Sequence, residues 1–489
     1  MKKITSASLQ FYVFIYLIFF CAISFLGVYD SLKTLVLFSL LLVFFLNLKI
    51  KNVLLSVYIV GILSLQFVSP NKYYFVQVIE PYKLLEIAYS EGYYTGYGIS
   101  LSNIYSLLII ALILRVIYQS KEKKRYFDLK KNIILLATAI FVISGIYSAS
   151  RYSPFAALSY TWLLQYSQPF VLALAYLMLQ KINKYATNVF TLMVISVTIL
   201  YQSLIIFLQF IKQSSIGIST EIVTGTSFFT GLDENNAMYR PSGTFMFHNQ
   251  VSLVLAICLA VISPHMIKKN NKLFTICFYC GLTSIVLTQS RSVWVGLTLA
   301  FYIFIRSNYR KLFKIMSQFG IRKMIMYLLL SILVLGPVIF SRLILSLNTM
   351  YDGAGFPIRM RLLTEGMEVL RNNFLVGYGP GTNEYMLNSF FPDGVTTVFP
   401  APVHTGIIQL LIEVGIIGAS AFLFPFIFTF IVLVKQRNSN DFEKKSVFIF
   451  AATICFVYYL FLPHVGIVEF AYIGLPLGYG FQAIKAQKI

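Results

Sequence analysis

Two arginines stand in short polar motifs between long apolar runs. In RPSGTFMFHNQ (240–250), Arg240 precedes a Pro-Ser-Gly turn, and in TQSRSVWVGL (288–297), Arg291 lies in a tight turn between two apolar stretches. The planar guanidinium group binds phosphate or carboxylate through two parallel hydrogen bonds. A single interfacial arginine can instead extend toward lipid headgroups. Together the two motifs predict a binding site for an anion, most simply a phosphate.

A third motif, VHTGIIQLLIEVGIIG (403–418), places a histidine in the first turn of a predicted apolar helix. With an ordinary pKa near 6.5, His404 could act as a general base; the alternative is a hydrogen-bonded histidine at the membrane interface. Glu413 lies about 900° of rotation and roughly 13 Å of rise further along the helix. The two side chains therefore cannot form one catalytic pair, and we expect Glu413 to pair with or cap a neighbouring element.

The remaining histidine and cysteine motifs have structural interpretations. His248 precedes Asn249 at the predicted start of a helix, where capping is the expected role and substrate binding the alternative. Cys277 and Cys280 form a CxxC motif without a second cysteine pair or a polar partner nearby. We interpret that pair as core packing rather than a redox or metal site, and we predict no metal site and no cofactor.

Residues 357–374, PIRMRLLTEGMEVLRNNF, have the spacing of an amphipathic helix. Apolar residues recur every three or four positions, at Met360, Leu363, Met367, Leu370 and Phe374. The opposite, polar face carries Arg361, Glu365, Glu368 and Asn372. Such a helix is suited to the membrane–water boundary or to covering a cavity, and the glycines of VGYGPG (376–381) should end it. Arg359 and Arg361 are possible substrate-binding residues, and a purely structural lid is the alternative.

The elements that must position these residues are membrane helices. Of the 489 residues, 58% are hydrophobic, against about 45–50% in ordinary proteins, and a membrane helix needs about 20 apolar residues. The sequence predicts an all-α polytopic membrane protein with about fourteen (12–14) transmembrane helices. It forms a single domain over 1–489, of which residues 344–402 are a large external loop. The predicted spans are 9–28, 32–47, 53–69, 99–118, 132–150, 158–180, 187–211, 249–267, 273–289, 292–306, 324–343, 403–434, 446–463 and 467–485.

Charged loops predict the orientation of these helices. Lysine-rich connections such as KEKKRYFDLKK (121–131) and KQRNSNDFEKK (435–445) fall on one side, which the positive-inside rule makes cytoplasmic, together with both termini. The net charge of +21 is then mainly a topology signal, and no nucleic-acid partner is needed to explain it. On the outer side most basic residues are arginines, as anion binding would require, although lipid anchoring and ion pairs are alternatives. These are Arg151, Arg240, Arg291, Arg342, Arg359, Arg361 and Arg371.

The motifs occur together in an order that resembles one known family. R-x-S-G-x-F-x-x-x-N, S-R-S-x-W, the helix with Arg359 and Arg361 ending in G-Y-G-P-G, and H-x-x-x-x-Q-L-L-x-E-x-G-x-x-G follow one another within about 240–418. They resemble the O-antigen ligase and O-antigen polymerase superfamily of bacterial envelope glycosyltransferases. The N-terminal half matches only in being polytopic.

The resemblance implies a GT-C-like membrane enzyme of the bacterial cytoplasmic (inner) membrane, with its catalytic cavity at the outer face. The family's donor is a glycan on undecaprenyl pyrophosphate, and it requires neither metal nor nucleotide sugar. Its catalytic histidine falls on His404 and its two arginines on Arg240 and Arg291. Many members have asparagine after the histidine, where this chain has Thr405. Direct displacement would invert the anomeric carbon, with Arg359 and Arg361 helping to hold donor or acceptor.

Three functions stay open within these expectations. A polymerase joining lipid-linked repeat units of O-antigen, capsule or exopolysaccharide is favoured, because the Tyr-rich external segment 70–98 suggests room for two glycans. A ligase would transfer the chain to lipid A core or another acceptor. A lipid-linked oligosaccharide flippase is a third possibility, but charges are nearly absent from the middle of the predicted spans. Membrane lipid and a chain-length regulator are possible partners.

Overall fold

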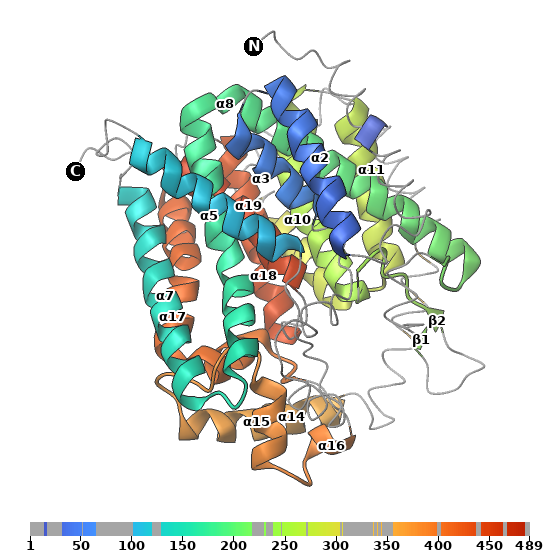
Figure 1. Cartoon of the computed structure of the whole chain (residues 1–489). Helices are drawn as coiled ribbons and strands as arrows, with labels where there is room; N and C mark the ends of the chain where they lie inside the picture. Colours follow the sequence, from blue (N-terminus) through green and yellow to red (C-terminus); the bar gives the residue numbers. More distant parts are fainter. Residues whose placement is uncertain are drawn as a thin grey trace. The chain divides into compact units, whose positions relative to one another are not determined.

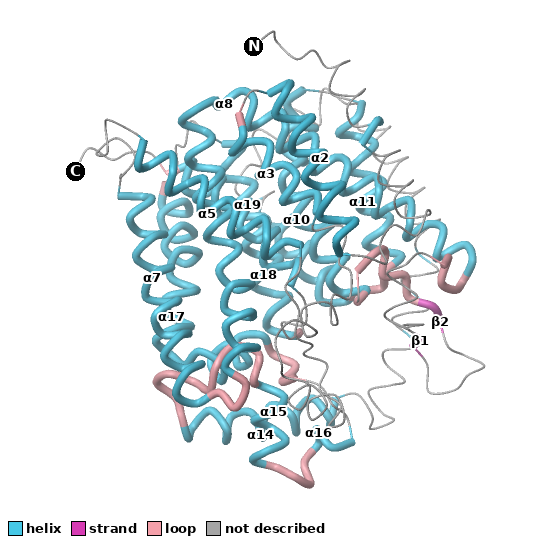
Figure 2. The backbone as a smooth tube through the Cα atoms, viewed as in Figure 1, coloured by secondary structure: helices cyan, strands magenta, loops and turns pink. Residues whose placement is uncertain are grey.

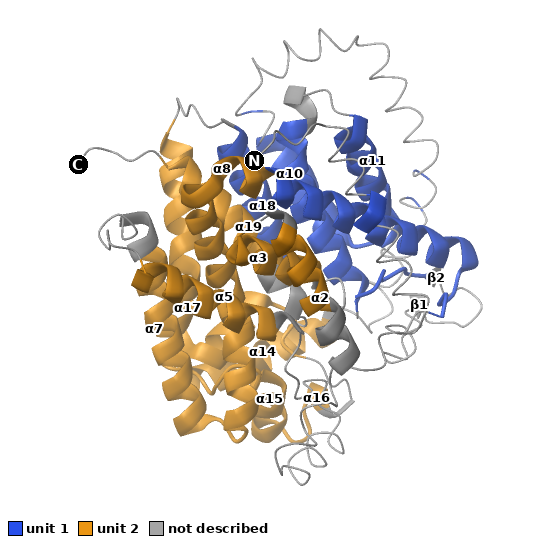
Figure 3. Ribbon diagram, turned by 45° about the horizontal axis from the view of Figure 1, so that its top comes forward, with its two compact units in different colours: residues 1–28, 189–352, 439–458 blue, residues 29–188, 353–438, 459–489 orange. Residues whose placement is uncertain are grey.

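The computed structural model is helical almost throughout the part of the chain that it describes (Figures 1 and 2). That part comprises residues 14–16, 32–50, 52–64, 101–119, 129–217, 229–230, 238–245, 247–269, 272–303, 306, 336, 340, 344, 356–398, 402–436, 442–462 and 467–484. The chain groups into two compact units (Figure 3). Unit 1 contains residues 1–28, 189–352 and 439–458, and unit 2 contains residues 29–188, 353–438 and 459–489.

Unit 2 is built around a pair of long helices, α7 (Leu129–Tyr152) and α17 (Gly406–Lys435), which lie side by side (Figure 1). Aromatic rings fill the space between them and the first part of α8 (Ala156–Lys212): the ring centroids of Phe141 and Phe422 are 5.4 Å apart, and those of Phe170 and Phe422 also 5.4 Å. The Phe170–Phe422 pair is edge-to-face, a preferred geometry of aromatic pairs. The other helices of this unit are α2 (Leu32–Ile50), α3 (Val53–Ser64), α5 (Leu101–Gln119), α14 (Phe356–Asn372), α15 (Asn383–Phe390), α16 (Val395–Val398) and α19 (Ile467–Ala483).

Unit 1 contains the remainder of α8 and a helical hairpin. In the hairpin α10 (His248–Lys269) packs on α11 (Lys272–Leu287), and the chain re-enters a helix at residue 291. Gly281 lets α11 approach Leu259 and Ile199 closely, because a Cβ atom there would lie 2.9 Å from the Leu259 side chain. A two-residue antiparallel pair, β1 (Phe229–Thr230) with β2 (Met238–Tyr239), precedes the hairpin, with Phe229 opposite Tyr239. Most of α18 (Phe442–Phe461) also belongs to this unit.

Five described helices are long and apolar enough to cross a membrane, so the chain is a membrane protein as predicted. They are Ile133–Tyr152, Ala156–Lys212, His248–His265, Gly406–Lys435 and Glu443–Phe461, and shorter apolar helices accompany them. The full number of fourteen stays a prediction. The expected spans 9–28 and 324–343 lie almost entirely outside the described residues, and segment 70–98 lies wholly outside them.

The predicted spans 158–180 and 187–211 are joined without a loop. Both belong to α8, which is interrupted at Asn183 (φ −152°, ψ 86°). The Asn183 side chain accepts a hydrogen bond from the Ala186 N–H at 3.0 Å, as a residue that begins a new helix does. The sequence pattern predicted a connection of several residues between the two spans. In the structure the single residue Asn183 separates the two helical parts.

Candidate active site

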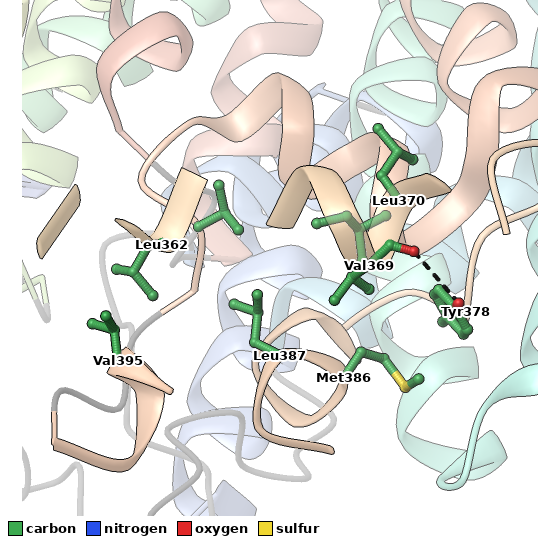
Figure 4. Close-up of a cluster of buried hydrophobic side chains, with 9 residues drawn as sticks. Leu362, Val369, Leu370, Tyr378, Met386, Leu387 and Val395 are labelled. Carbon is green, nitrogen blue, oxygen red and sulfur yellow. Dashed lines mark hydrogen bonds between the residues drawn. The ribbon is translucent and has the colours of Figure 1, made fainter. Parts of the chain in front are cut away.

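The helix carrying Arg359 and Arg361 forms as predicted, but its buried face differs from the predicted one. α14 covers Phe356–Asn372, and Leu362, Val369 and Leu370 are its buried apolar residues (Figure 4). Three members of the predicted apolar row are exposed, Met360, Met367 and Phe374. The helix turns its buried side toward α15, α16 and α17, and this contact decides which residues are covered.

Glu365, predicted on the polar face of this helix, is buried. Its carboxylate lies 3.2 Å from Arg361 Nε and accepts the Val395 N–H at 3.3 Å, where α16 begins. The sequence pattern placed Glu365 on the polar face of the helix, and α16 covers this position. For Arg361 the structure shows the alternative considered from the sequence, an ion pair with an acidic neighbour. Its side chain is still 64% exposed.

The helix that follows His404 is broken at Gly415, which has φ 64°. The main chain of residues 374–379 forms hydrogen bonds on both sides of the break. Tyr378 and Gly379 donate their N–H groups to the carbonyls of Ile412 and Glu413, at 2.9 and 2.7 Å. On the other side of the break, Ile416 N–H donates to the Phe374 carbonyl at 2.9 Å, and Ile417 N–H donates to that of Leu375 at 3.3 Å.

Close approach explains the glycines at this crossing. A Cβ atom on Gly377 (φ 72°) would lie 2.5 Å from the Gly415 nitrogen, and one on Gly415 would collide with the Leu375 carbonyl. Both residues also adopt the left-handed backbone conformation that favours glycine. The glycines turn the chain as predicted, with positive φ at Gly377, Gly379 and Gly381. The helix itself ends earlier, at Asn372.

Glu413 pairs with neighbouring elements, as its position on the helix predicted. Its carboxylate accepts three hydrogen bonds: Oε2 from the Tyr166 hydroxyl at 2.6 Å and the Gly381 N–H at 2.9 Å, and Oε1 from the Gln409 amide at 3.0 Å. Ser148 donates to its main-chain carbonyl at 3.1 Å. Glu413 is fully buried, and these donors offset the cost of removing a carboxylate from water.

His404 lies just before α17 rather than in its first turn, because the helix begins at Gly406 with Thr405 as its N-cap. The His404 Nδ1 atom is 3.2 Å from the Pro402 carbonyl. A proton on Nδ1 donated to that carbonyl leaves Nε2 as the acceptor nitrogen of a neutral ring. Burial and the positive charge of Arg359 lower the pKa of His404 to about 4, against a smaller opposing effect of the Pro402 carbonyl. His404 is therefore a neutral imidazole at physiological pH, and Arg359 is its electrostatic neighbour.

The two arginine motifs of unit 1 meet. Arg240 is buried, and its Nη2 donates to the Gln289 carbonyl at 3.0 Å. Gln289 belongs to the turn that precedes the exposed Arg291, and it adopts a left-handed conformation (φ 57°). The Trp294 indole N–H fixes this turn by donating to the Ile285 carbonyl at 3.1 Å. The motifs of Arg240 and Arg291 are therefore in contact within this unit, and the predicted convergence of all three motifs, with His404 in the third, stays a prediction.

Two glutamines that the sequence did not single out hold the Pro-Ser-Gly turn after Arg240. Gln209 pairs with both main-chain groups of Gly243, each at 2.9 Å. Gln202 accepts the Thr244 N–H at 3.1 Å and donates to its hydroxyl at 2.6 Å. The available signal was two amides seven residues apart, on one face of an apolar helix. Polar groups in such a run are costly unless they have partners.

The other candidate residues have simple positions. His248 is buried as the first residue of α10, in unit 1. Cys277 is buried, and its thiol lies 4.0 Å from the Ser196 carbonyl; neither it nor the half-buried Cys280 forms a disulfide. In the described ranges no cluster of three histidine, cysteine, aspartate or glutamate residues is arranged to hold a metal ion. Arg240, His248 and Arg291 belong to unit 1, and Arg359, Arg361 and His404 belong to unit 2.

Residues 276–423 match the family model described as O-antigen ligase. This match confirms the resemblance to the O-antigen ligase and polymerase superfamily. The matched region includes Arg291, Arg359, Arg361 and His404, whereas Arg240 and His248 precede it. It supports a glycosyltransferase of the ligase or polymerase type, with a lipid-linked glycan and an acceptor as substrates. No curated protein matches the chain.

Proposed function

We propose that the protein is a membrane glycosyltransferase that polymerises undecaprenyl-pyrophosphate-linked oligosaccharide units at the outer face of the bacterial cytoplasmic membrane. The observation that carries this proposal is the state of His404 in the O-antigen ligase region. A half-buried, neutral imidazole with Nδ1 directed at a carbonyl is in the protonation state that a general base requires. GT-C-like architecture, both termini in the cytoplasm and an outward-facing site are parts of the same proposal.

The reaction forms one glycosidic bond and breaks one bond to phosphate. An acceptor hydroxyl attacks the anomeric carbon of the donor while its proton moves to His404 Nε2. The bond between the anomeric carbon and the pyrophosphate oxygen breaks, and the electron pair leaves with the lipid pyrophosphate. Attack opposite the leaving group inverts the configuration at that carbon.

Arg240 and Arg291 are the proposed ligands of the departing pyrophosphate, supplying the positive charge that metal ions supply in other phosphate chemistry. In support, the Arg240 side chain is hydrogen-bonded to the turn that precedes Arg291. This contact preorganises the positive charge of Arg240 next to the Arg291 motif. A preorganised charge stabilises the developing anion without reorganisation during the reaction. Arg359 contributes positive charge beside His404 and is the better supported of the two possible substrate-binding arginines of α14.

The protonation of His404 depends on the bound donor. A pKa near 4 makes resting His404 a weak base, but a bound pyrophosphate brings negative charge that favours the imidazolium form. The donor would thereby strengthen the base that acts on its own acceptor. Without donor the ring stays neutral and ready to accept.

The deciding experiment uses the purified protein in lipid nanodiscs with lipid-linked repeat units. Lengthening of the glycan in the wild type, and its loss in His404→Ala at equal membrane abundance, is the expected result. Near-normal lengthening by His404→Ala would overturn the assignment of the base. An exposed site on the lid helix, Asn372→Ala, serves as the control for substitution in this region.

A ligase is the second candidate, because the description of the matching family model names that activity. Supplying both a lipid-linked repeat unit and a lipid A core acceptor distinguishes the two. Transfer to the core alone indicates a ligase, and a ladder of lengthened lipid-linked products indicates a polymerase. Translocation of the lipid-linked unit without any new bond would indicate a flippase and contradict both.

A further inference from the structure

The main chain that carries His404 is fixed from outside its own helix. Because α17 begins at Gly406, helical hydrogen bonds do not hold the residues before it. The Val403 N–H instead donates to Asn383 Oδ1 at 3.0 Å. The Val403 side chain is fully buried in the apolar cluster that joins α14, α15 and α17, and it contacts α14 at Gly366.

Asn383 is itself positioned by Glu413. It is the first residue of α15, and the main-chain N–H of Gly381, two residues before it, donates to the Glu413 carboxylate at 2.9 Å. A negative charge beside the start of a helix is also favoured by the helix dipole. Glu413 is held in turn by Tyr166 of α8 and Gln409 of α17. One buried carboxylate thus fixes the start of α15, and the side chain of α15's first residue fixes Val403.

We propose that Asn383 and Glu413 are positioning residues for His404. Glu413 sets the place of Asn383, and Asn383 sets the main chain one residue before the imidazole. Neither residue is required to touch the donor or the acceptor. The catalytic meaning of this link rests on the proposed function, in which His404 is the base; the physical link from Glu413 to Val403 does not.

Loss of a positioning residue changes the geometry of His404, whereas loss of a purely structural residue changes only stability. Loss of the Asn383 side chain frees Val403 and lets the imidazole move relative to the reacting hydroxyl. A displacement of about 1 Å can lower a rate about 100-fold, while binding of the donor through other residues stays the same. We therefore expect a fall in kcat with little change in KM for the donor, together with altered chemical accessibility of the His404 ring.

The test compares the full-length wild type with Asn383→Ala in nanodiscs. Three quantities are measured: kcat and KM for glycan transfer, the rate at which diethyl pyrocarbonate modifies His404, followed by mass spectrometry of its peptide, and the unfolding temperature. The reagent attacks neutral imidazole, so the second quantity reports on His404 whether or not the protein transfers glycan. Asn372→Ala is the matched control, because its exposed amide bonds to the Glu368 carbonyl of its own helix.

In Asn383→Ala we expect kcat to fall about 10- to 100-fold with KM within about twofold, and the modification rate of His404 to change several-fold. The control should match the wild type. If Asn383→Ala does not accumulate, Glu413→Gln, which keeps one oxygen for the Gly381 N–H, is measured by the same readouts. It is expected to shift both in the same direction by a smaller factor.

The outcomes separate this inference from the proposed function. Unchanged kcat and unchanged His404 modification in Asn383→Ala would overturn the inference, even with His404→Ala inactive. A change in His404 modification in Asn383→Ala, with full activity in His404→Ala, would support the positioning link while overturning the assignment of His404 as the base.

Discussion

The guanidinium group of Arg240 donates to the main-chain carbonyl of Gln289 at 3.0 Å. Two motifs that are separated by a complete helical hairpin are therefore in direct contact. The guanidinium group carries its donors in one planar fork, a geometry that a lysine ammonium group cannot reproduce.

Arg240→Lys should reduce glycan transfer at least about tenfold, which corresponds to about 1.4 kcal/mol of transition-state stabilisation. Lysine keeps the positive charge but cannot bind the Gln289 carbonyl and a phosphate through one planar fork. Initial rates with a lipid-linked donor measure this effect. Arg291→Lys should behave in the same direction, and Arg371→Lys, an exposed site on the lid helix, should remain active. Full activity of both Arg240→Lys and Arg291→Lys would contradict bidentate binding of pyrophosphate.

Arg359→Gln should shift the acid limb of the pH–rate profile upward. The Arg359 charge helps to lower the pKa of His404 to about 4, and transfer requires the neutral ring. In the wild type kcat/KM therefore falls only as pH drops through about 4. Removing the positive charge makes protonation easier, so the fall begins at higher pH. Arg371→Gln is the control, and an acid limb that does not move in Arg359→Gln would remove Arg359 as the electrostatic neighbour.

Gly415→Ala should destabilise unit 2 severely. Its φ of 64° costs an ordinary residue about 1–2 kcal/mol, and the added methyl group would meet the Leu375 carbonyl. The unfolding temperature in detergent and the yield of membrane-inserted protein measure the loss. Ser420→Ala, at an exposed position of the same helix, should have little effect, and equal stability of the two variants would disprove the close approach.

Gln209→Leu should destabilise the turn that follows Arg240. The substitution keeps the approximate size of the side chain but leaves the buried N–H and carbonyl of Gly243 without their pair. Each such group costs about 1–3 kcal/mol. Thermal unfolding measures this loss, and Leu204→Ala, on the more exposed side of the same helix, is the comparison. If Gln209→Leu unfolds at the wild-type temperature, the two hydrogen bonds between Gln209 and Gly243 contribute little to stability.

Helix positions followed directly from the sequence because apolar runs are constrained by the bilayer. The lid helix was predicted at 357–374 and found at Phe356–Asn372, and helical rotation alone separated Glu413 from His404. Long-range partners could not be predicted in the same way. That Glu365 is covered depends on α16, and the roles of Gln202 and Gln209 depend on a turn more than 30 residues away.

The break in α17 could not be predicted from the sequence either. A glycine in an apolar helix is usually a packing position, and only the approach of the 374–379 segment shows why Gly415 must turn left-handed. The start of this helix after His404 was likewise not predicted, because the chain before Gly406 is held by Asn383 of α15.

The crossing at Gly415 has a consequence for how the enzyme could diversify. All four hydrogen bonds between residues 374–379 and 412–417 join main chain to main chain. The side chains of Phe374 and Leu375 take no part in them and project outward. Substitution of these two side chains would thus alter the exposed surface here while the four main-chain hydrogen bonds are preserved. Related proteins could therefore differ in sequence at these two positions and keep the same crossing.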